Sequence, residues 1–187
     1  MKFFRLDVFK AVQAIGVLLH ATQNERLEYL SIIKMLYIAD RESWKETGSP
    51  ITYDLPMAMK NGPVLSGILD LVNLNRDEGL PIWATFIHKE DYDLQLKADP
   101  GTDRLSPYEV RKLNEIGKRY ADKNWRQMID LGHNLPEWKQ NDPRELGLNY
   151  TPIPLEDILT AVGRDKDASS IMEDEAAVIA MRNALGN

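Results

Sequence analysis

The first part of the chain carries apolar residues at the spacing of a helix. Four of them follow one another at intervals of three or four residues: Phe9, Val12, Ile15 and Leu19. This spacing places them on one face of a helix and predicts that the face packs in the protein core. Asp7 stands just before them, where a carboxylate accepts hydrogen bonds from the free amides of a first helical turn. A helix is therefore expected from Asp7 to about Thr22.

The next segment is apolar on almost every side. Between Leu27 and Ala39 only three residues are polar. In a helix these positions and the next two basic ones share one narrow side: Glu28, Ser31, Lys34, Arg41 and Lys45. A helix with so little polar surface normally lies at the centre of its fold. The sequence predicts such a helix from Glu25 to Glu46, capped by Asn24 and ended by Gly48.

Turn residues and alternating apolar residues follow. The stretch from Pro50 to Ala58 is typical of a small hairpin or an extended loop. Asn61 to Pro63 predicts a turn, with Pro63 as the first residue of a helix. Two segments of strand-like composition, Ile82 to Ile87 and Leu94 to Ala98, flank the polar residues Lys89 to Asp93. A two-stranded ribbon is expected there.

Capping and turn residues divide the second half of the chain into short helices. Ser106 to Glu109 forms a capping box with proline at the first helical position, which predicts that a helix begins there. Further short helices are expected over Trp125 to Leu131 and over Leu155 to Val162. A second capping box, Ser170 to Glu173, predicts a terminal helix whose apolar face extends to Leu185.

These elements predict a mainly α fold of the α+β class, in which helices surround a central buried helix and a small β-hairpin lies beside them. The length of 187 residues and the hydrophobic content of 43% suit one core, so a single domain is expected over residues 1–187. The chain has no cysteine. Packing, and not disulfides or thiolate-bound metal, must therefore stabilise the fold.

The formal net charge of −6 argues against a nucleic-acid partner, because an acidic chain repels a phosphate backbone. The N-terminus, Met1 to Phe9, has charged residues at Lys2, Arg5 and Asp7 and so lacks the uninterrupted apolar run of a signal peptide. No apolar stretch is long enough for a membrane span. The expected location is the cytoplasm, with no membrane partner.

The sequence offers little for catalysis or for cofactors. The three histidines, His20, His88 and His133, fall on different expected elements, so a metal site built from them is not expected. His133 and Glu137 are four residues apart, but Gly132 and Pro136 argue against one helix that contains both. The chain has neither a phosphate-binding loop nor a nucleophile elbow. No catalytic residue, no cofactor and no metal is expected, and the chain is not expected to be an enzyme.

Asp40 is the most informative polar residue. Helical geometry places it beside Leu36 and Trp44, away from the polar side of the central helix. A carboxylate in that position needs a partner. Arg41 points to the opposite side, which leaves Lys60 as the nearest cation in the sequence. We expect a buried ion pair that joins the central helix to the following turn.

Three segments together resemble the signature of one known family. They are Lys34 to Arg41 (KMLYIADR), Gly48 to Thr52 (GSPIT) and Ala58 to Val64 (AMKNGPV). Their residues, order and spacing resemble the Panacea domain of SocA-like antitoxins. His133 to Trp138 and the start of the helix at Ser106 are similar to later motifs of that family. The motif-bearing part spans about residues 24–140, and a variable helical tail follows over about residues 150–187.

The resemblance implies a mostly helical domain with a small β-element, which acts as the antitoxin of a bacterial or phage toxin–antitoxin pair. Its expected partner is a cognate toxin, neutralised by direct protein–protein binding. A protease is a second partner if the chain acts as an adaptor that delivers the toxin for degradation. A third possibility is a small-molecule-binding or enzymatic domain, which would need Asp40, Lys60 and His133 to meet in one apolar cleft.

The matching residues have structural interpretations. Gly62 and Pro63 shape a turn, Ser106 caps a helix, and Tyr37 packs. A motif shared by antitoxins of unlike toxins should mainly encode the scaffold, which would leave specificity to the ribbon Ile82 to Ala98 and to the tail from Asn149. The full set of candidate structural or partner-binding residues is Lys34, Tyr37, Asp40, Arg41, Pro50, Lys60, Gly62, Pro63, Ser106, His133 and Trp138.

Overall fold

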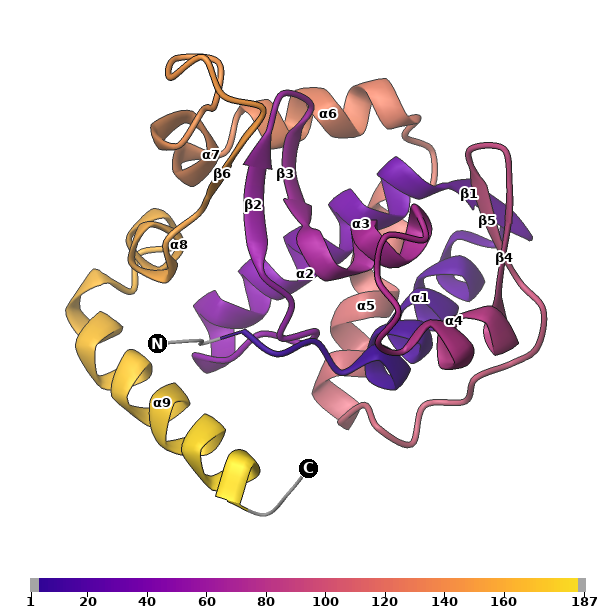
Figure 1. Ribbon diagram of the computed structural model, residues 1–187, viewed down its shortest axis with the longest axis horizontal. Coiled ribbons are helices and arrows are strands. Elements are labelled where there is room, and N and C mark those ends of the chain that lie inside the picture. The colour runs from indigo at the N-terminus through magenta and orange to yellow at the C-terminus, as the bar shows by residue number, and fades with distance from the viewer. Residues whose placement is uncertain (1–3, 185–187) are drawn as a thin grey trace.

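The computed structural model describes residues 4–184; the predicted apolar position Leu185 lies outside this range. Its longest element, α2 (Tyr29–Thr47), runs through the middle of the molecule, with the other helices arranged around it (Figure 1). Ile33, Leu36 and Ala39 of α2 are completely buried. The described residues also form two small antiparallel sheets, so the predicted α+β class and the central buried helix are confirmed.

Two helices with strong capping signals are formed as expected. In α1 (Val8–Thr22), the Asp7 carboxylate accepts a hydrogen bond from the Lys10 amide at 3.0 Å. The helix α5 (Pro107–Tyr120) begins with the predicted capping box and packs against both α1 and α2. Gly117 permits this packing, because a Cβ there would lie 2.7 Å from the Cβ of Ala21. The capping residues thus start α1 and α5 where the sequence predicts, and the two helices pack closely against each other.

The start of the central helix differs from the prediction. Residues Arg26–Glu28 form strand β1, which pairs with β5 (Asp93–Leu96), and α2 begins only at Tyr29. The strand with which β1 pairs lies about 70 residues away in the sequence, so no local pattern predicts β1. The end of the helix is confirmed, because Gly48 adopts a positive φ of 79°. Part of the narrow polar side of α2 is buried as well: Ser31 and Lys34 are only 2% and 1% exposed, whereas Lys45 is exposed.

One sheet has the strand order β3-β2-β6 and lies beside α2 (Figure 1). Strands β2 (Pro56–Met59) and β3 (Gly62–Leu65) form a hairpin, and β6 (Tyr150–Pro152) pairs with the other edge of β2. The prediction of a helix that begins at Pro63 is wrong, because α3 (Ser66–Val72) starts three residues later. Proline has no N–H group to donate to a neighbouring strand. It is tolerated in β3 because β3 is an edge strand and pairs on one side only.

The second sheet joins β1, β5 and β4 (Ile87–Glu90). The predicted ribbon is shorter than expected: Leu80–Phe86 form the helix α4, so a strand from Ile82 is wrong. Pro81 occupies the first turn of this helix, which follows the positive-φ residue Gly79. A short apolar run suits a strand and a helix equally, and these flanking residues favoured the helix.

The described part of the C-terminal third, up to residue 184, forms four α-helices: α6 (Trp125–His133), α7 (Pro136–Gln140), α8 (Leu155–Ala161) and α9 (Ala168–Ala184). The break between α6 and α7 confirms that His133 and Glu137 do not share a helix. The predicted start of the last helix at Ser170 is wrong, since a 3-10 turn over Asp165–Asp167 leads directly into α9. Among the described residues, no helix has the length and apolar character needed to cross a bilayer.

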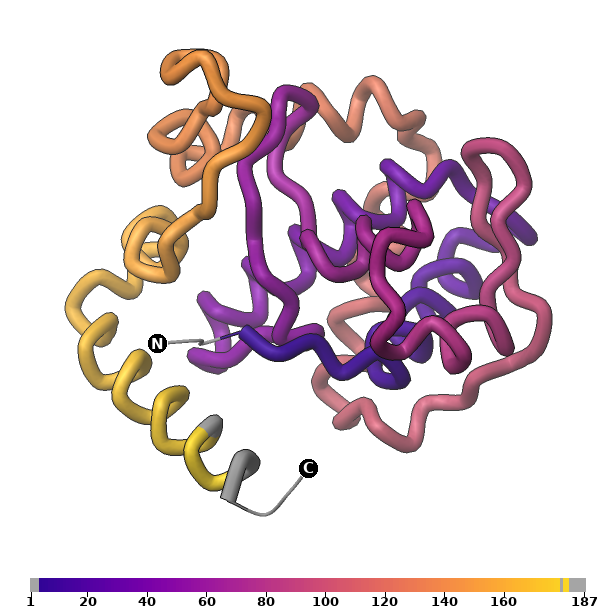
Figure 2. Tube along the Cα trace, in the orientation of Figure 1, coloured from indigo at the N-terminus to yellow at the C-terminus, as the bar shows by residue number. Residues whose placement is uncertain are grey.

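The helix α9 contacts the rest of the molecule mainly through its first half. Ile171 is buried against Gly48, and the Ser49 hydroxyl donates to the Glu175 carboxylate at 2.6 Å. Val178 and Met181, farther along, are 39% and 67% exposed. The chain trace in Figure 2 shows the helix extending away from α8 along one side of the molecule. Part of the predicted variable tail is thus docked on the core.

Candidate functional site

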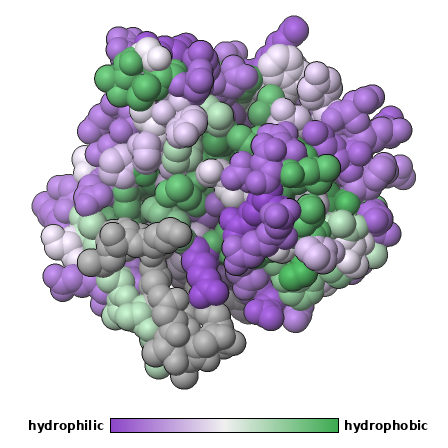
Figure 3. Space-filling model, viewed as in Figure 1, coloured by the Kyte–Doolittle hydropathy of each residue, from purple (hydrophilic) through white to green (hydrophobic). Residues whose placement is uncertain are grey.

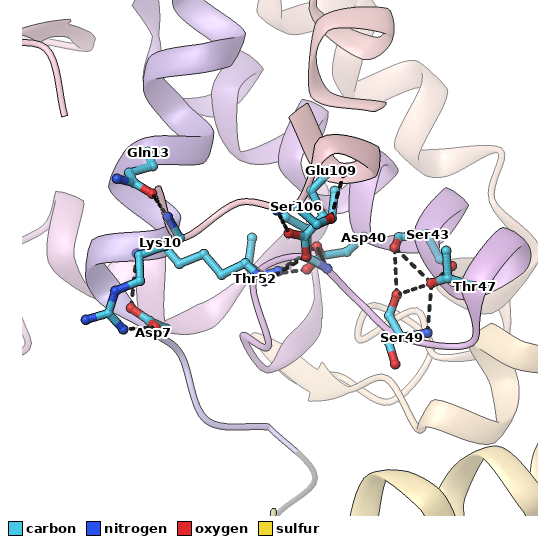
Figure 4. A network of polar contacts seen from close by, with 12 residues as sticks. Asp7, Lys10, Gln13, Asp40, Ser43, Thr47, Ser49, Thr52, Ser106 and Glu109 are labelled. Atoms are coloured by element: carbon cyan, nitrogen blue, oxygen red, sulfur yellow. Dashed lines mark hydrogen bonds and ion pairs between the residues drawn. The ribbon is translucent and has the colours of Figure 1, made fainter. Parts of the chain in front are cut away.

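The carboxylate of Asp40 holds the loop that follows α2. Its Oδ1 accepts hydrogen bonds from the amides of Ile51 and Thr52, both at 2.9 Å, and its Oδ2 accepts from the Thr52 hydroxyl at 2.5 Å (Figure 4). Asp40 is 5% exposed. The predicted ion pair with Lys60 is wrong, because Lys60 is exposed while loop donors surround the Asp40 carboxylate. Burial was predicted correctly, and the kind of partner was not.

The same loop is fastened at its other end. The Ser43 and Thr47 hydroxyls both donate to the Ser49 carbonyl, at 2.6 and 3.1 Å (Figure 4). Pro50 lies between these contacts and is buried. The loop from Gly48 to Thr52 is therefore fixed to α2 by side chains two helical turns apart. This fixation gives the family-like segment GSPIT a structural role.

Asp54 repeats the arrangement seen at Asp40. Its carboxylate accepts from the amide of Leu55 at 2.7 Å and from those of Gly67 and Ile68, both at 2.8 Å. The last two amides belong to the first turn of α3, so this carboxylate joins the loop to the start of that helix. Asp54 was not among the predicted site residues, since a single aspartate in a loop carries no periodic signal.

Lys34 lies on the other side of the central helix, against the hairpin β2–β3. Its Nζ donates to the Pro63 carbonyl at 2.5 Å, and among the described residues it forms no ion pair with a carboxylate. A Cβ at Gly62, where φ is +89°, would lie 3.0 Å from this Nζ, so a side chain there would be both strained and crowded. Lys34, Gly62 and Pro63 thus form one contact between helix and hairpin.

A fully buried glutamate connects α2 to α7. Glu137 is 0% exposed, and its carboxylate accepts from Arg41 Nε at 2.6 Å and from the Tyr37 hydroxyl at 3.2 Å. Arg41 also reaches the Ala161 carbonyl of α8 at 3.4 Å. Glu137 was not among the predicted site residues, although its place in the segment His133 to Trp138 offered a signal. Tyr37 and Arg41 are the partners of Glu137. Because the Tyr37 hydroxyl is buried, its pKa is raised well above the usual value.

Two aromatic rings fasten α6 and α7 to the hairpin. The rings of His133 and Trp138 stack with centroids 4.2 Å apart. Trp138 Nε1 donates to the Met59 carbonyl at 3.0 Å, and a ring nitrogen of His133 lies 3.1 Å from the Lys60 carbonyl. The guanidinium of Arg144 covers the other side of Trp138, 4.8 Å from its ring centroid. Lys60 therefore takes part through its backbone, and its side chain remains exposed.

The predicted site residues form two groups around α2. One group joins Asp40 to the loop at Pro50; the other joins Lys34, Tyr37 and Arg41 to the hairpin and to α7, while Ser106 caps α5 elsewhere. Asp40 and His133 are bonded to different backbone segments, and neither His133 nor Lys60 lines the cavity beside Asp40. The cavity beside Asp40 and Asp54 measures about 10 Å³, near the minimum for one water molecule. Within residues 4–184, no cluster of three metal-binding side chains occurs.

This arrangement defines a helical scaffold in which Lys34, Asp40 and Trp138 bond to neighbouring backbone, while Tyr37 and Arg41 bond to the buried Glu137. The model of a family described as "Antitoxin SocA-like, Panacea domain" matches residues 32–139, and the chain belongs to this family. The resemblance seen in the sequence is therefore confirmed. No curated protein and no solved structure matches the chain.

Three buried ionisable groups give the fold an expected pH dependence. Burial raises the pKa of Asp40 to about 7 and that of Asp54 to about 6, so their contribution to stability is complete below pH 3.8 and is lost as the pH rises through these values. Burial lowers the pKa of Lys34 to about 7. Its contribution is complete above pH 10.5 and is lost as the pH falls through 7.

The opposite slopes predict that these groups stabilise the fold least near pH 7. Relative to Asp40→Asn, the wild-type free energy of unfolding should rise by about 1 kcal/mol or more from pH 7 to pH 5. Relative to Lys34→Met, it should rise from pH 7 to pH 9. Urea unfolding at the three pH values measures both differences, and the matched variants cancel the titration of exposed groups. Differences that stay constant with pH would contradict the prediction.

Proposed function

We propose that this chain is an antitoxin that neutralises a cognate toxin by direct protein–protein binding. The family is one of antitoxins, which supports a toxin as the partner. One observation carries the proposal further: the family-motif side chains Lys34, Asp40 and Trp138 are at most 5% exposed and bond to the chain's own backbone. Side chains used in this way support the scaffold, and partner recognition falls to the surface around it.

The charge of the chain favours a protein partner of opposite sign. Its net charge of −6 attracts a basic protein and accelerates the encounter with it. The same charge disfavours a phosphate backbone. We therefore propose a non-enzymatic role in which the chain covers a basic toxin. The chain's action in the cytoplasm, where such a toxin would be made, is part of this proposal.

Co-expression with the product of the adjacent gene tests the proposal. The neighbouring protein alone should arrest growth of the host, and simultaneous expression of this chain should restore it. A chain with a stop codon before α2 serves as the control, since it produces the transcript without the fold. A neighbour that is harmless alone, or toxicity unaffected by this chain, would contradict the proposal.

Purified proteins separate direct neutralisation from delivery to a protease. Direct binding predicts co-elution of the two proteins in size-exclusion chromatography and inhibition of the toxin without any third component. Protection should then persist in hosts that lack their cytoplasmic proteases. Protection that disappears in a protease-deficient host, together with normal toxin activity in the purified mixture, would instead identify the chain as an adaptor.

A further inference from the structure

A hollow with aromatic walls lies at one end of α2. It measures about 480 Å³ and is lined by Glu28, Tyr29, Leu30, Asn61, Tyr92 and Trp125. These residues come from the start of α2, the tips of both hairpins and the first turn of α6, which Figure 1 shows on the same side of the molecule. We call this surface the aromatic groove.

The walls of the aromatic groove are held in place before any partner binds. The Tyr29 amide donates to the Tyr92 carbonyl at 2.8 Å, and the two rings stack with centroids 6.4 Å apart. The Trp125 amide is directed to the Glu28 carboxylate at 3.4 Å. Tyr92 is nevertheless 71% exposed, and Tyr29 and Trp125 are partly exposed. Aromatic residues that are both ordered and accessible commonly contribute most of the binding free energy of a protein–protein interface.

Cations already occupy the ring faces at the rim. Lys89 Nζ lies 5.4 Å from the centroid of Tyr29, and the Arg126 guanidinium lies 5.0 Å from that of Trp125. Both distances are within the range of a cation–π interaction. Within the described part of the chain, the only hydrogen bond to the Glu28 carboxylate is the long one from Trp125. The groove therefore combines ring faces that attract cations with a carboxylate that has acceptor capacity left.

We propose that the aromatic groove receives an arginine side chain of the toxin; this inference rests on the proposed antitoxin function. The planar guanidinium stacks on aromatic rings and binds a carboxylate through two N–H groups, which matches the rings of Tyr92 and Trp125 and the carboxylate of Glu28. The aliphatic stem of arginine suits the apolar wall at Leu30. The net charge of −6 favours a basic partner.

A second exposed apolar surface offers a matched control. Leu146 and Leu148, in the loop between α7 and β6, are 65% and 48% exposed. Figure 3 shows a green patch at the upper left, where Figure 1 places this loop. Neither residue lines the aromatic groove. A double variant, Leu146→Ser with Leu148→Ser, removes two exposed apolar side chains without changing the groove.

The test measures toxin binding and growth rescue by full-length variants. Tyr92→Ala and Trp125→Ala should each weaken binding about 30-fold or more, the effect of losing an aromatic interface anchor. Glu28→Gln keeps the shape of the groove and should weaken binding about tenfold, with a reduced dependence on salt. The loop double variant should bind as the wild type does. Thermal unfolding checks that each variant is folded; if Trp125→Ala is not, the exposed Tyr92 and the isosteric Glu28→Gln decide.

The outcomes separate the two proposals. A wild-type chain that neither binds the toxin nor protects the host overturns the antitoxin function itself. A wild-type chain that protects, with folded groove variants that protect and bind equally well, overturns the aromatic groove alone. Loss of binding in the loop double variant together with normal binding in the groove variants would place the toxin on Leu146 and Leu148 and also reject this inference.

Discussion

Replacement of Glu137 by alanine is expected to lower the free energy of unfolding by about 3–5 kcal/mol, the cost of breaking a buried ion pair from one side. Glu137 is 0% exposed and accepts hydrogen bonds from Arg41 and Tyr37. Its removal leaves a guanidinium with only a weak contact to the Ala161 carbonyl, 3.4 Å away, and leaves a buried hydroxyl without its acceptor. Urea unfolding followed by circular dichroism measures the change.

Two further variants test whether the lost pairing causes this effect. Glu137→Gln retains the shape and one acceptor oxygen, so it should cost less than the alanine variant. Glu156→Ala removes an exposed glutamate from α8 and should change stability by no more than about 0.5 kcal/mol. A loss below about 1 kcal/mol for Glu137→Ala would show that Arg41 and Tyr37 find other partners. The conclusion that Glu137 stabilises the contact between α2 and α7 would then be wrong.

Asp40→Ala is expected to cost about 3 kcal/mol or more, because it removes the acceptor of three donors at once. The amides of Ile51 and Thr52 and the Thr52 hydroxyl lie in the interior, and each buried donor left without a partner costs about 1–3 kcal/mol. The loop after α2 should then loosen. Hydrogen exchange at the amides of Ile51 and Thr52 measures that loosening, and denaturant unfolding measures the loss of stability.

Lys60→Ala distinguishes this explanation from a buried ion pair. Because the Lys60 side chain is exposed, its removal should change stability by about 0.5 kcal/mol or less. The loss of stability on Asp40→Asn should be larger than that on Lys60→Ala and smaller than that on Asp40→Ala, since the asparagine amide retains only one acceptor oxygen for the loop donors. A loss on Lys60→Ala as large as that on Asp40→Ala would restore the ion pair and contradict the contacts described for Asp40.

The sequence predicted the elements whose signals are local. Asp7 and Ser106 cap helices where they were expected to, and Gly48 ends the central helix, because caps and helical periodicity act over a few residues. Strand β1 escaped prediction because it depends on pairing with Asp93–Leu96, far along the chain. The helix at Leu80–Phe86 was mistaken for a strand because seven residues hold too little periodicity to decide.

The candidate residues were predicted better than their contacts. Helical geometry alone showed that Asp40 is buried, but the backbone amides that approach it are set by the course of a loop. Glu137 and Asp54 were missed as site residues for the same reason: burial of an isolated carboxylate is a property of the folded chain. Lys34 was predicted on a narrow polar side, and its Nζ binds the hairpin backbone.

The polar groups fixed on α2 also determine how freely the outside of the protein can change. Asp40, Lys34 and Glu137 stabilise the fold from within, through contacts that no residue of the aromatic groove shares. Substitutions at separated sites without common partners have nearly additive effects. Changes at Tyr92 or Trp125 should therefore leave the contacts of Asp40, Lys34 and Glu137 as they are. Such a chain can exchange one binding partner for another over evolutionary time while it keeps the same interior.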